Sequence, residues 1–132
     1  MEASVFVGFI DRAHPKHEQA AANFRFFAEE EYMIFTDHTS LMDAYTTIYK
    51  EISPSLAKDF MRTISLSNIN ILYPEEQDSK AALKALVTYQ STDLTFPKAL
   101  SAVLAQKRGI TQICTFDYLH PLFGQILFYL PI

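Results

Sequence analysis

Residues 32–48, YMIFTDHTSLMDAYTTI, join a short β-prone stretch to a helical pattern. Tyr32 to Thr36 is apolar and rich in residue types that favour strands. The residues that follow place four apolar side chains on one face of a helix: Leu41, Ala44, Tyr45 and Ile48. This segment therefore predicts a strand that leads directly into a helix, the unit from which α/β sheets are built.

The same order of elements repeats along the rest of the chain. Apolar residues at helical spacing predict further helices over residues 16–30, 54–65, 79–89 and 97–108. Short apolar runs predict further strands over residues 69–73, 112–116 and 126–130. Strands that alternate with helices form a mostly parallel central sheet with helices on both faces. The expected fold class is therefore a three-layer α/β fold.

The composition is that of one folded domain spanning residues 1–132. A chain of 132 residues with 49% hydrophobic residues buries enough apolar surface to offset the entropy lost on folding. The longest apolar runs, Val5 to Ile10 and Ile126 to Ile132, are far shorter than a membrane helix. Cys114 is the single cysteine, and no stretch has the features of a secretory signal. These observations predict a cytoplasmic protein with no membrane span.

The net charge and the glycines argue against two kinds of ligand site. A net charge of −4 disfavours a broad basic surface for nucleic acid, so any contact with RNA must be local. The three glycines, Gly8, Gly109 and Gly124, stand apart and form neither a phosphate loop nor a dinucleotide fingerprint. Nucleotide-cofactor chemistry is therefore not expected.

Four acidic residues fall where predicted strands end or helices begin: Glu2, Asp43, Asp93 and Asp117. Ligands of parallel α/β sheets bind beyond the carboxyl ends of the strands, so these side chains are candidates for a site. Each also has an ordinary structural explanation. Asp43 stands three residues after Ser40, as in a helix-capping box. Asp117 can cap the turn after its strand, and Glu2 can be simply solvated.

Four segments resemble the motifs of the PIN-domain family, in order and at the family's spacing. The first is residues 2–20, EASVFVGFIDRAHPKHEQA, and the second is residues 36–48, TDHTSLMDAYTTI. The third is residues 93–110, DLTFPKALSAVLAQKRGI, and the fourth is residues 110–124, ITQICTFDYLHPLFG. Together they cover nearly the whole chain, and VapC-type toxins are the most similar group. The resemblance implies the PIN-like form of a three-layer α/β fold.

The resemblance also implies a metal-dependent endoribonuclease with an acidic site. In the family, carboxylates hold Mg²⁺ or Mn²⁺, which activates water at a phosphodiester. Carried over by position, the first, second and fourth acids fall on Glu2, Asp43 and Asp117, the expected catalytic and metal-binding residues. The third falls on Lys98, which halves the formal negative charge of the site, and Asp93 is expected to lean in to compensate.

Two functions follow from this departure at Lys98. One is a ribonuclease that Lys98 weakens, acting on RNA, restrained by an antitoxin protein and paired as a homodimer. The alternative is a catalytically inactive PIN-fold protein that acts in binding or self-association, with the ammonium of Lys98 in place of the cation.

The start of the chain leaves two registers open. In the family the first acid ends a central strand, whereas here only Met1 precedes Glu2. One hypothesis is a reading frame that starts upstream, with Ser4 to Ile10 as a short helix. The other makes Val5 to Ile10 the strand and places Asp11 at its end. We favour the family register.

Two further residue pairs suggest other chemistry. His14 and His17 are about one helical turn apart, but no third ligand at a recognisable spacing supports a zinc site. Cys114 with His120 suggests a thiol nucleophile, yet a cysteine within an apolar strand is usually a buried small hydrophobe. For both pairs we favour the structural explanation.

Overall fold

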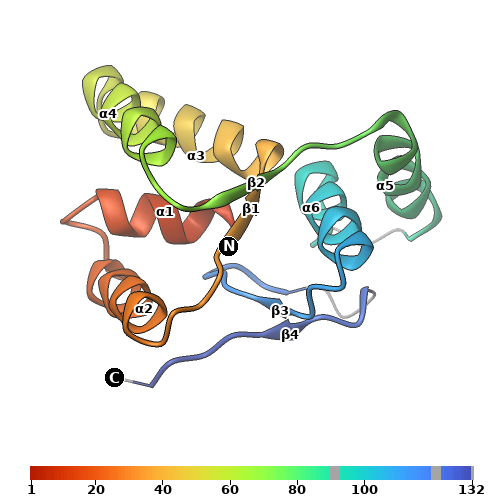
Figure 1. Cartoon of the computed structure of the whole chain (residues 1–132). Helices are drawn as coiled ribbons and strands as arrows, with labels where there is room; N and C mark the ends of the chain where they lie inside the picture. The colour runs from red at the N-terminus through yellow and green to blue at the C-terminus, as the bar shows by residue number, and fades with distance from the viewer. Residues whose placement is uncertain (90–92, 120–122, 132) are drawn as a thin grey trace.

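Six helices and four short strands form the part of the chain that the computed structural model describes, residues 1–89, 93–119 and 123–131 (Figure 1). The helices are α1 (Ala3–Ile10), α2 (His17–Glu29), α3 (His38–Glu51), α4 (Pro54–Ser65), α5 (Glu76–Thr88) and α6 (Phe96–Lys107). The strands are β1 (Phe35–Asp37), β2 (Asn70–Leu72), β3 (Gln112–Ile113) and β4 (Ile126–Leu127). Within these ranges no helix is both long enough and apolar enough to cross a membrane.

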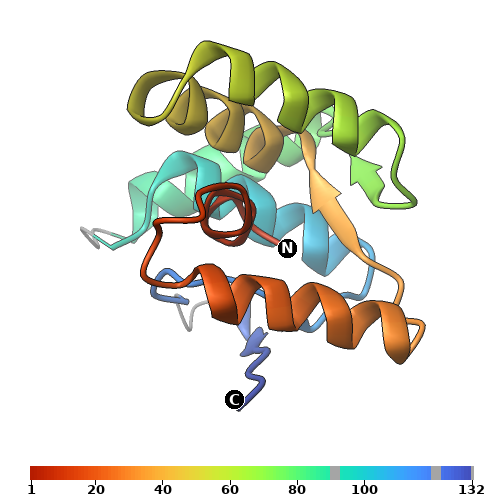
Figure 2. The same cartoon turned by 90° about the vertical axis from the view of Figure 1, so that its left-hand side faces the viewer.

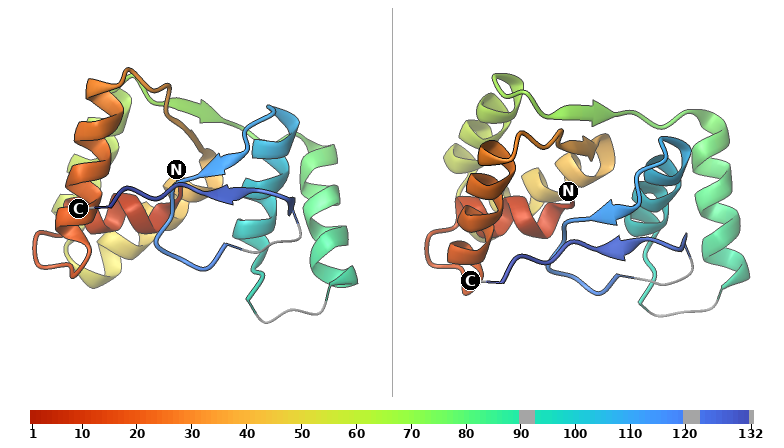
Figure 3. Two further views of the ribbon diagram at one scale, coloured as in Figure 1. Left: turned by 90° about the horizontal axis from the view of Figure 1, so that it is seen from below. Right: turned by 60° about the horizontal axis from the view of Figure 1, so that its bottom comes forward.

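Both pairs of strands are parallel, as the sequence predicted. Phe35 of β1 pairs with Asn70 of β2, and Gln112 of β3 pairs with Ile126 of β4. The chain between β1 and β2 forms α3 and α4, a crossover of the kind that parallel strands require. Figure 3 shows β3 and β4 side by side, with α6 next to them. The predicted α/β fold class is therefore confirmed.

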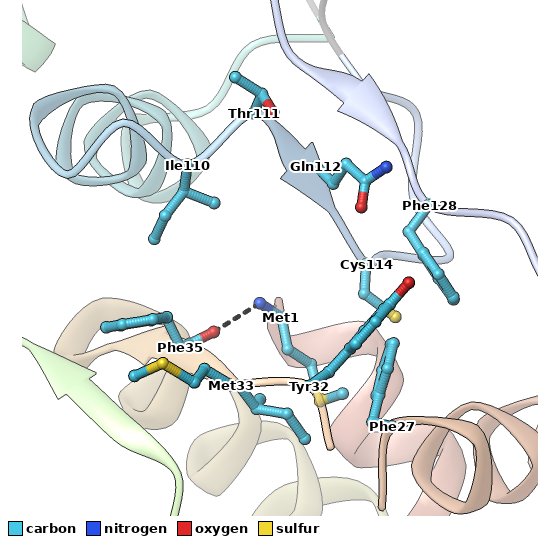
Figure 4. Close-up of a pocket in the computed structure, with 11 residues that line it drawn as sticks. Met1, Phe27, Tyr32, Met33, Phe35, Ile110, Thr111, Gln112, Cys114 and Phe128 are labelled. Atoms are coloured by element: carbon cyan, nitrogen blue, oxygen red, sulfur yellow. Dashed lines mark hydrogen bonds between the residues drawn. The ribbon is translucent and has the colours of Figure 1, made fainter. Parts of the chain in front are cut away.

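The first two residues join the two pairs of strands. The ammonium group of Met1 donates a hydrogen bond to the carbonyl oxygen of Phe35 at 2.8 Å (Figure 4). The amide of Glu2 donates to the carbonyl oxygen of Cys114 at 3.0 Å, on the opposite side. Successive residues of a strand bond to opposite neighbours in this way. Met1 and Glu2 therefore lie like strand residues between β1 and the segment after β3.

Helix α1 decides between the two registers of the N-terminal region. Ala3–Ile10 is helical, so the alternative in which Val5 to Ile10 forms a strand is wrong. Val5 and Phe6 are buried, and the helix packs between α2 and α3, which explains its apolar composition (Figure 2). The family register, with a short helix over these residues, is confirmed.

The helices bury their apolar faces in separate clusters. Phe6, Ile48 and Phe60 bring α1, α3 and α4 together, and the ring centroids of Phe6 and Phe60 are 5.5 Å apart. Ala82 and Leu104 belong to a second cluster between α5 and α6. A third cluster joins α1, α2 and the segment after β3. These clusters fix the positions of α1, α3 and α6. Glu2 directly precedes α1, Asp43 lies in α3 and Lys98 lies in α6.

Some predicted boundaries differ from those in the structure. Helix α5 begins at Glu76 instead of Ser79, because Glu75 and Asp78 form a capping box at its start. Strand β3 ends at Ile113, because the next residues bond to the N-terminal segment and not to a strand. The carbonyl of Cys114 accepts from Glu2, and the amide of Phe116 donates to Ser4 Oγ at 2.9 Å.

Candidate functional site

Four residues that are far apart in the sequence line one pocket of about 380 Å³. They are Glu2 before α1, Asp43 in α3, Lys98 in α6 and Asp117 after β3. The same pocket is lined by the hydroxyl side chains of Ser40, Thr95 and Ser101. Asp93 is not among the lining residues. The chain therefore brings together three acidic side chains and one amine.

Glu2 is held at the pocket by the hydroxyl of Thr115. This hydroxyl donates to Glu2 Oε2 at 3.2 Å and accepts the backbone N–H of Asp117 at 3.1 Å. Ser4 Oγ lies 3.2 Å from the same hydroxyl and donates to it, since the Thr115 proton is already used. Burial raises the pKa of the Glu2 carboxyl, and the nearby N-terminal ammonium partly opposes this. Thr115 therefore connects two of the predicted acids.

Asp43 is free to face the pocket because another residue caps α3. The cap is Asp37, whose carboxylate accepts from the amide of Ser40 at 2.8 Å and from its hydroxyl at 2.9 Å. The capping box of Ser40 with Asp43 is therefore wrong. Partial burial raises the pKa of Asp43, the charge of Asp117 raises it further, and Lys98 opposes both.

Lys98 lies in the first turn of α6 and points toward Asp117. The Nζ–Oδ2 distance is 3.9 Å, and the two side chains are 28% and 49% exposed. Thr95 caps the helix by accepting the amide of Lys98 at 3.3 Å. An ion pair of this length and exposure contributes only about 0.2–1 kcal/mol to the free energy of unfolding. The pair can therefore open when a ligand competes for either partner.

The pocket has the donor chemistry of a divalent-ion site but not its arrangement. Carboxylate oxygens suit Mg²⁺ and Mn²⁺. Within residues 1–89, 93–119 and 123–131, however, no group of three His, Cys, Asp or Glu side chains could hold a metal ion. The ammonium of Lys98 also lies in the pocket. As arranged, these residues do not fit a metal ion.

The two other candidate chemistries receive no support from the local geometry. Burial raises the pKa of the Cys114 thiol to about 11, and Asn23 donates to its sulfur at 3.5 Å. His120 lies outside the described residues. His17 Nδ1 bonds to the carbonyl of Gly8 at 3.0 Å. Cys114 is therefore a buried core residue.

Comparison with known proteins assigns the family. The sequence model of the PIN domain matches residues 1–121, and the chain belongs to the PIN-domain family. Among solved structures, the chain is similar to Mycobacterium tuberculosis VapC20, described as a toxin that cleaves the sarcin-ricin loop. The TM-score is 0.78 at 17% identity, over 88% of this chain and 87% of that one. No curated protein sequence matches significantly. The VapC-like resemblance inferred from the four motifs is confirmed.

Proposed function

We propose that residues 1–132 form a single PIN domain that acts as an endoribonuclease and that Lys98 weakens its activity. The observation that carries the proposal is the convergence of Glu2, Asp43 and Asp117 on one pocket. Membership of the PIN-domain family and likeness to a VapC toxin support RNA as the substrate.

Each carboxylate has a different expected role at the pocket. Asp43 and Asp117 are both exposed, and Asp117 pairs only loosely with Lys98, so both are available to a ligand. Glu2 and Asp43 have raised pKa values and keep a proton to higher pH than usual. Family membership supports Mg²⁺ or Mn²⁺ as the cofactor, although Glu2, Asp43 and Asp117 could hold such an ion only in a rearranged pocket in which Lys98 no longer pairs with Asp117. When bound, the ion would supply a Lewis acid.

Lys98 accounts for the proposed weakening. Its ammonium halves the formal negative charge that four carboxylates would give, and it competes with a cation for Asp117. The second candidate function, a catalytically inactive PIN-fold protein in binding or self-association, is favoured by the same ion pair.

Cleavage of a labelled RNA by the full chain, with Mg²⁺ or Mn²⁺, separates the two candidates. We expect slow cleavage by the unmodified protein, none by Asp117→Asn, and faster cleavage by Lys98→Asp, which adds a fourth carboxylate. Lys84→Gln, an exposed change on α5, is the matched control and should leave the rate unchanged. If neither the unmodified protein nor Lys98→Asp cleaves with either ion, the inactive candidate holds.

The proposal includes a protein partner and a cellular setting. Likeness to a toxin supports a cytoplasmic protein that an antitoxin restrains, and we propose that two copies form a homodimer. Light scattering on the purified chain tests the homodimer, because a monomer mass at micromolar concentration would contradict it. Co-expression with the product of an adjacent gene tests the antitoxin, and failure to co-purify would count against it.

A further inference from the structure

A second pocket of about 380 Å³ lies directly beside the acidic pocket. The two share Ala3, Asp43 and Asp117 as a common wall. A polymer whose phosphate reaches these acids can therefore extend its next unit into the second pocket. The volume lies within the range of about 300–1,000 Å³ typical of small-molecule sites.

The ring of Phe116 forms an aromatic surface in this second pocket. It packs closely on α1 because Gly8 has no side chain, and a Cβ there would lie 3.1 Å from Phe116 Cε2. The bond from the Phe116 amide to Ser4 Oγ fixes the backbone beneath the ring. The ring is only partly buried, and Phe116 directly precedes Asp117 in the chain. A rigid, accessible ring next to a polar site is suited to stacking.

Two nitrogen donors flank this ring from the segment between α1 and α2. Lys16 Nζ lies 5.9 Å from the ring centroid of Phe116, and its side chain is exposed. His14 Nδ1 accepts the backbone N–H of Lys16 at 3.0 Å, so Nε2 is the ring nitrogen left to donate to a ligand. Both side chains line the pocket. An ammonium and an imidazole N–H beside an aromatic ring match the phosphate and base of a nucleotide.

We propose that this second pocket binds the nucleoside next to the phosphodiester at the acidic pocket. Its base stacks on Phe116, and Lys16 moves from the ring to the adjoining phosphate while His14 donates through Nε2. Any of the four bases can stack on an aromatic ring, so the subsite positions the RNA more than it selects a sequence. The inference rests on the proposed function, because it requires RNA at the acidic pocket.

Fluorescence anisotropy of a labelled eight-nucleotide oligouridylate, without divalent cations, tests the subsite apart from cleavage. Phe116→Leu keeps an apolar side chain on Gly8 but removes the aromatic face, and we expect about 5- to 100-fold weaker binding. Lys16→Gln should also lower the slope of log affinity against log salt by about 0.7, the contribution of one phosphate on a single strand. Tyr129→Leu and Lys84→Gln are matched exposed controls and should bind as the unmodified chain does.

An oligonucleotide with one abasic position gives a second measurement that does not depend on the stability of a variant. Moving the abasic position along the strand should weaken binding most at one place for the unmodified chain, and Phe116→Leu should lose that dependence. Unchanged affinity in both Phe116→Leu and Lys16→Gln, with RNA still bound, overturns the subsite and leaves the proposed function standing. No binding of RNA by the unmodified chain overturns the subsite, and the cleavage assay with Mg²⁺ or Mn²⁺ decides the proposed function separately.

Discussion

Replacing Lys98 by Gln should change stability only slightly. At 3.9 Å, the attraction between Lys98 Nζ and Asp117 Oδ2 is about 1 kcal/mol in water and about 4 kcal/mol at an effective dielectric constant of 20. Asp117 is 49% exposed, so solvent screening reduces this to about 0.2–1 kcal/mol. For a chain of 132 residues this loss lowers Tm by about 1–4 °C.

The same replacement should strengthen cation binding. Removing about 0.2–1 kcal/mol of competition for Asp117 raises the Mn²⁺ affinity by at most roughly five-fold. Urea denaturation and calorimetric titration with Mn²⁺ measure the two effects on the same samples. A stability loss above about 2 kcal/mol, beyond what exposed pairs contribute, would refute the reasoning, because Lys98 would then be a structural residue. An unchanged Mn²⁺ affinity would show that the ammonium does not compete with a cation.

Three further changes test other parts of the structure. Because its folded-state pKa is raised, Glu2 contributes stability below its unfolded pKa that is lost as pH rises through the folded pKa. Glu2→Gln should therefore gain stability relative to the unmodified chain as the pH rises above the unfolded pKa of Glu2, and a difference independent of pH in urea titrations would contradict this. Asp37→Ala removes the α3 cap and the shorter of the two hydrogen bonds of the buried Ser40 hydroxyl, whose other partner is Ser101 Oγ. Thermal denaturation should show a loss of about 1–2 kcal/mol, and no loss would exclude the cap. Gly8→Ala gains about 1 kcal/mol of helix propensity, but the added methyl group crowds the Phe116 ring at a cost of about 1–3 kcal/mol. We therefore expect a net loss of folding stability, and a more stable variant would show that the ring moves freely.

The helices could be predicted from the sequence because their apolar residues recur at a clear period. The strands could be predicted less well, since they are only two or three residues long. The sequence predicts a single strand over residues 112–116, which includes Cys114 and Phe116. In the structure, the segment after Ile113 bonds to Glu2 and Ser4 instead, a long-range pairing that local propensity does not encode.

The acids of the pocket could be located from motif positions, but their supporting residues could not. Asp37 caps α3, and the sequence feature that could have identified it is an acidic residue three positions before Ser40. Thr115 is different, because its hydroxyl meets Glu2 only when the two ends of the chain come together. No periodicity or local motif marks such a contact. Lys98 was identified only by its departure from the family pattern.

The position of Met1 has a practical consequence for handling this protein. Burial lowers the pKa of its amino group, and the group is directed between β1 and the segment after β3 (Figure 4). An affinity tag or fluorophore attached to that nitrogen would have to leave through the space between the two strand pairs. It would thereby disturb Glu2, the next residue. Labels intended to report on ligand binding therefore belong on an exposed helix such as α5.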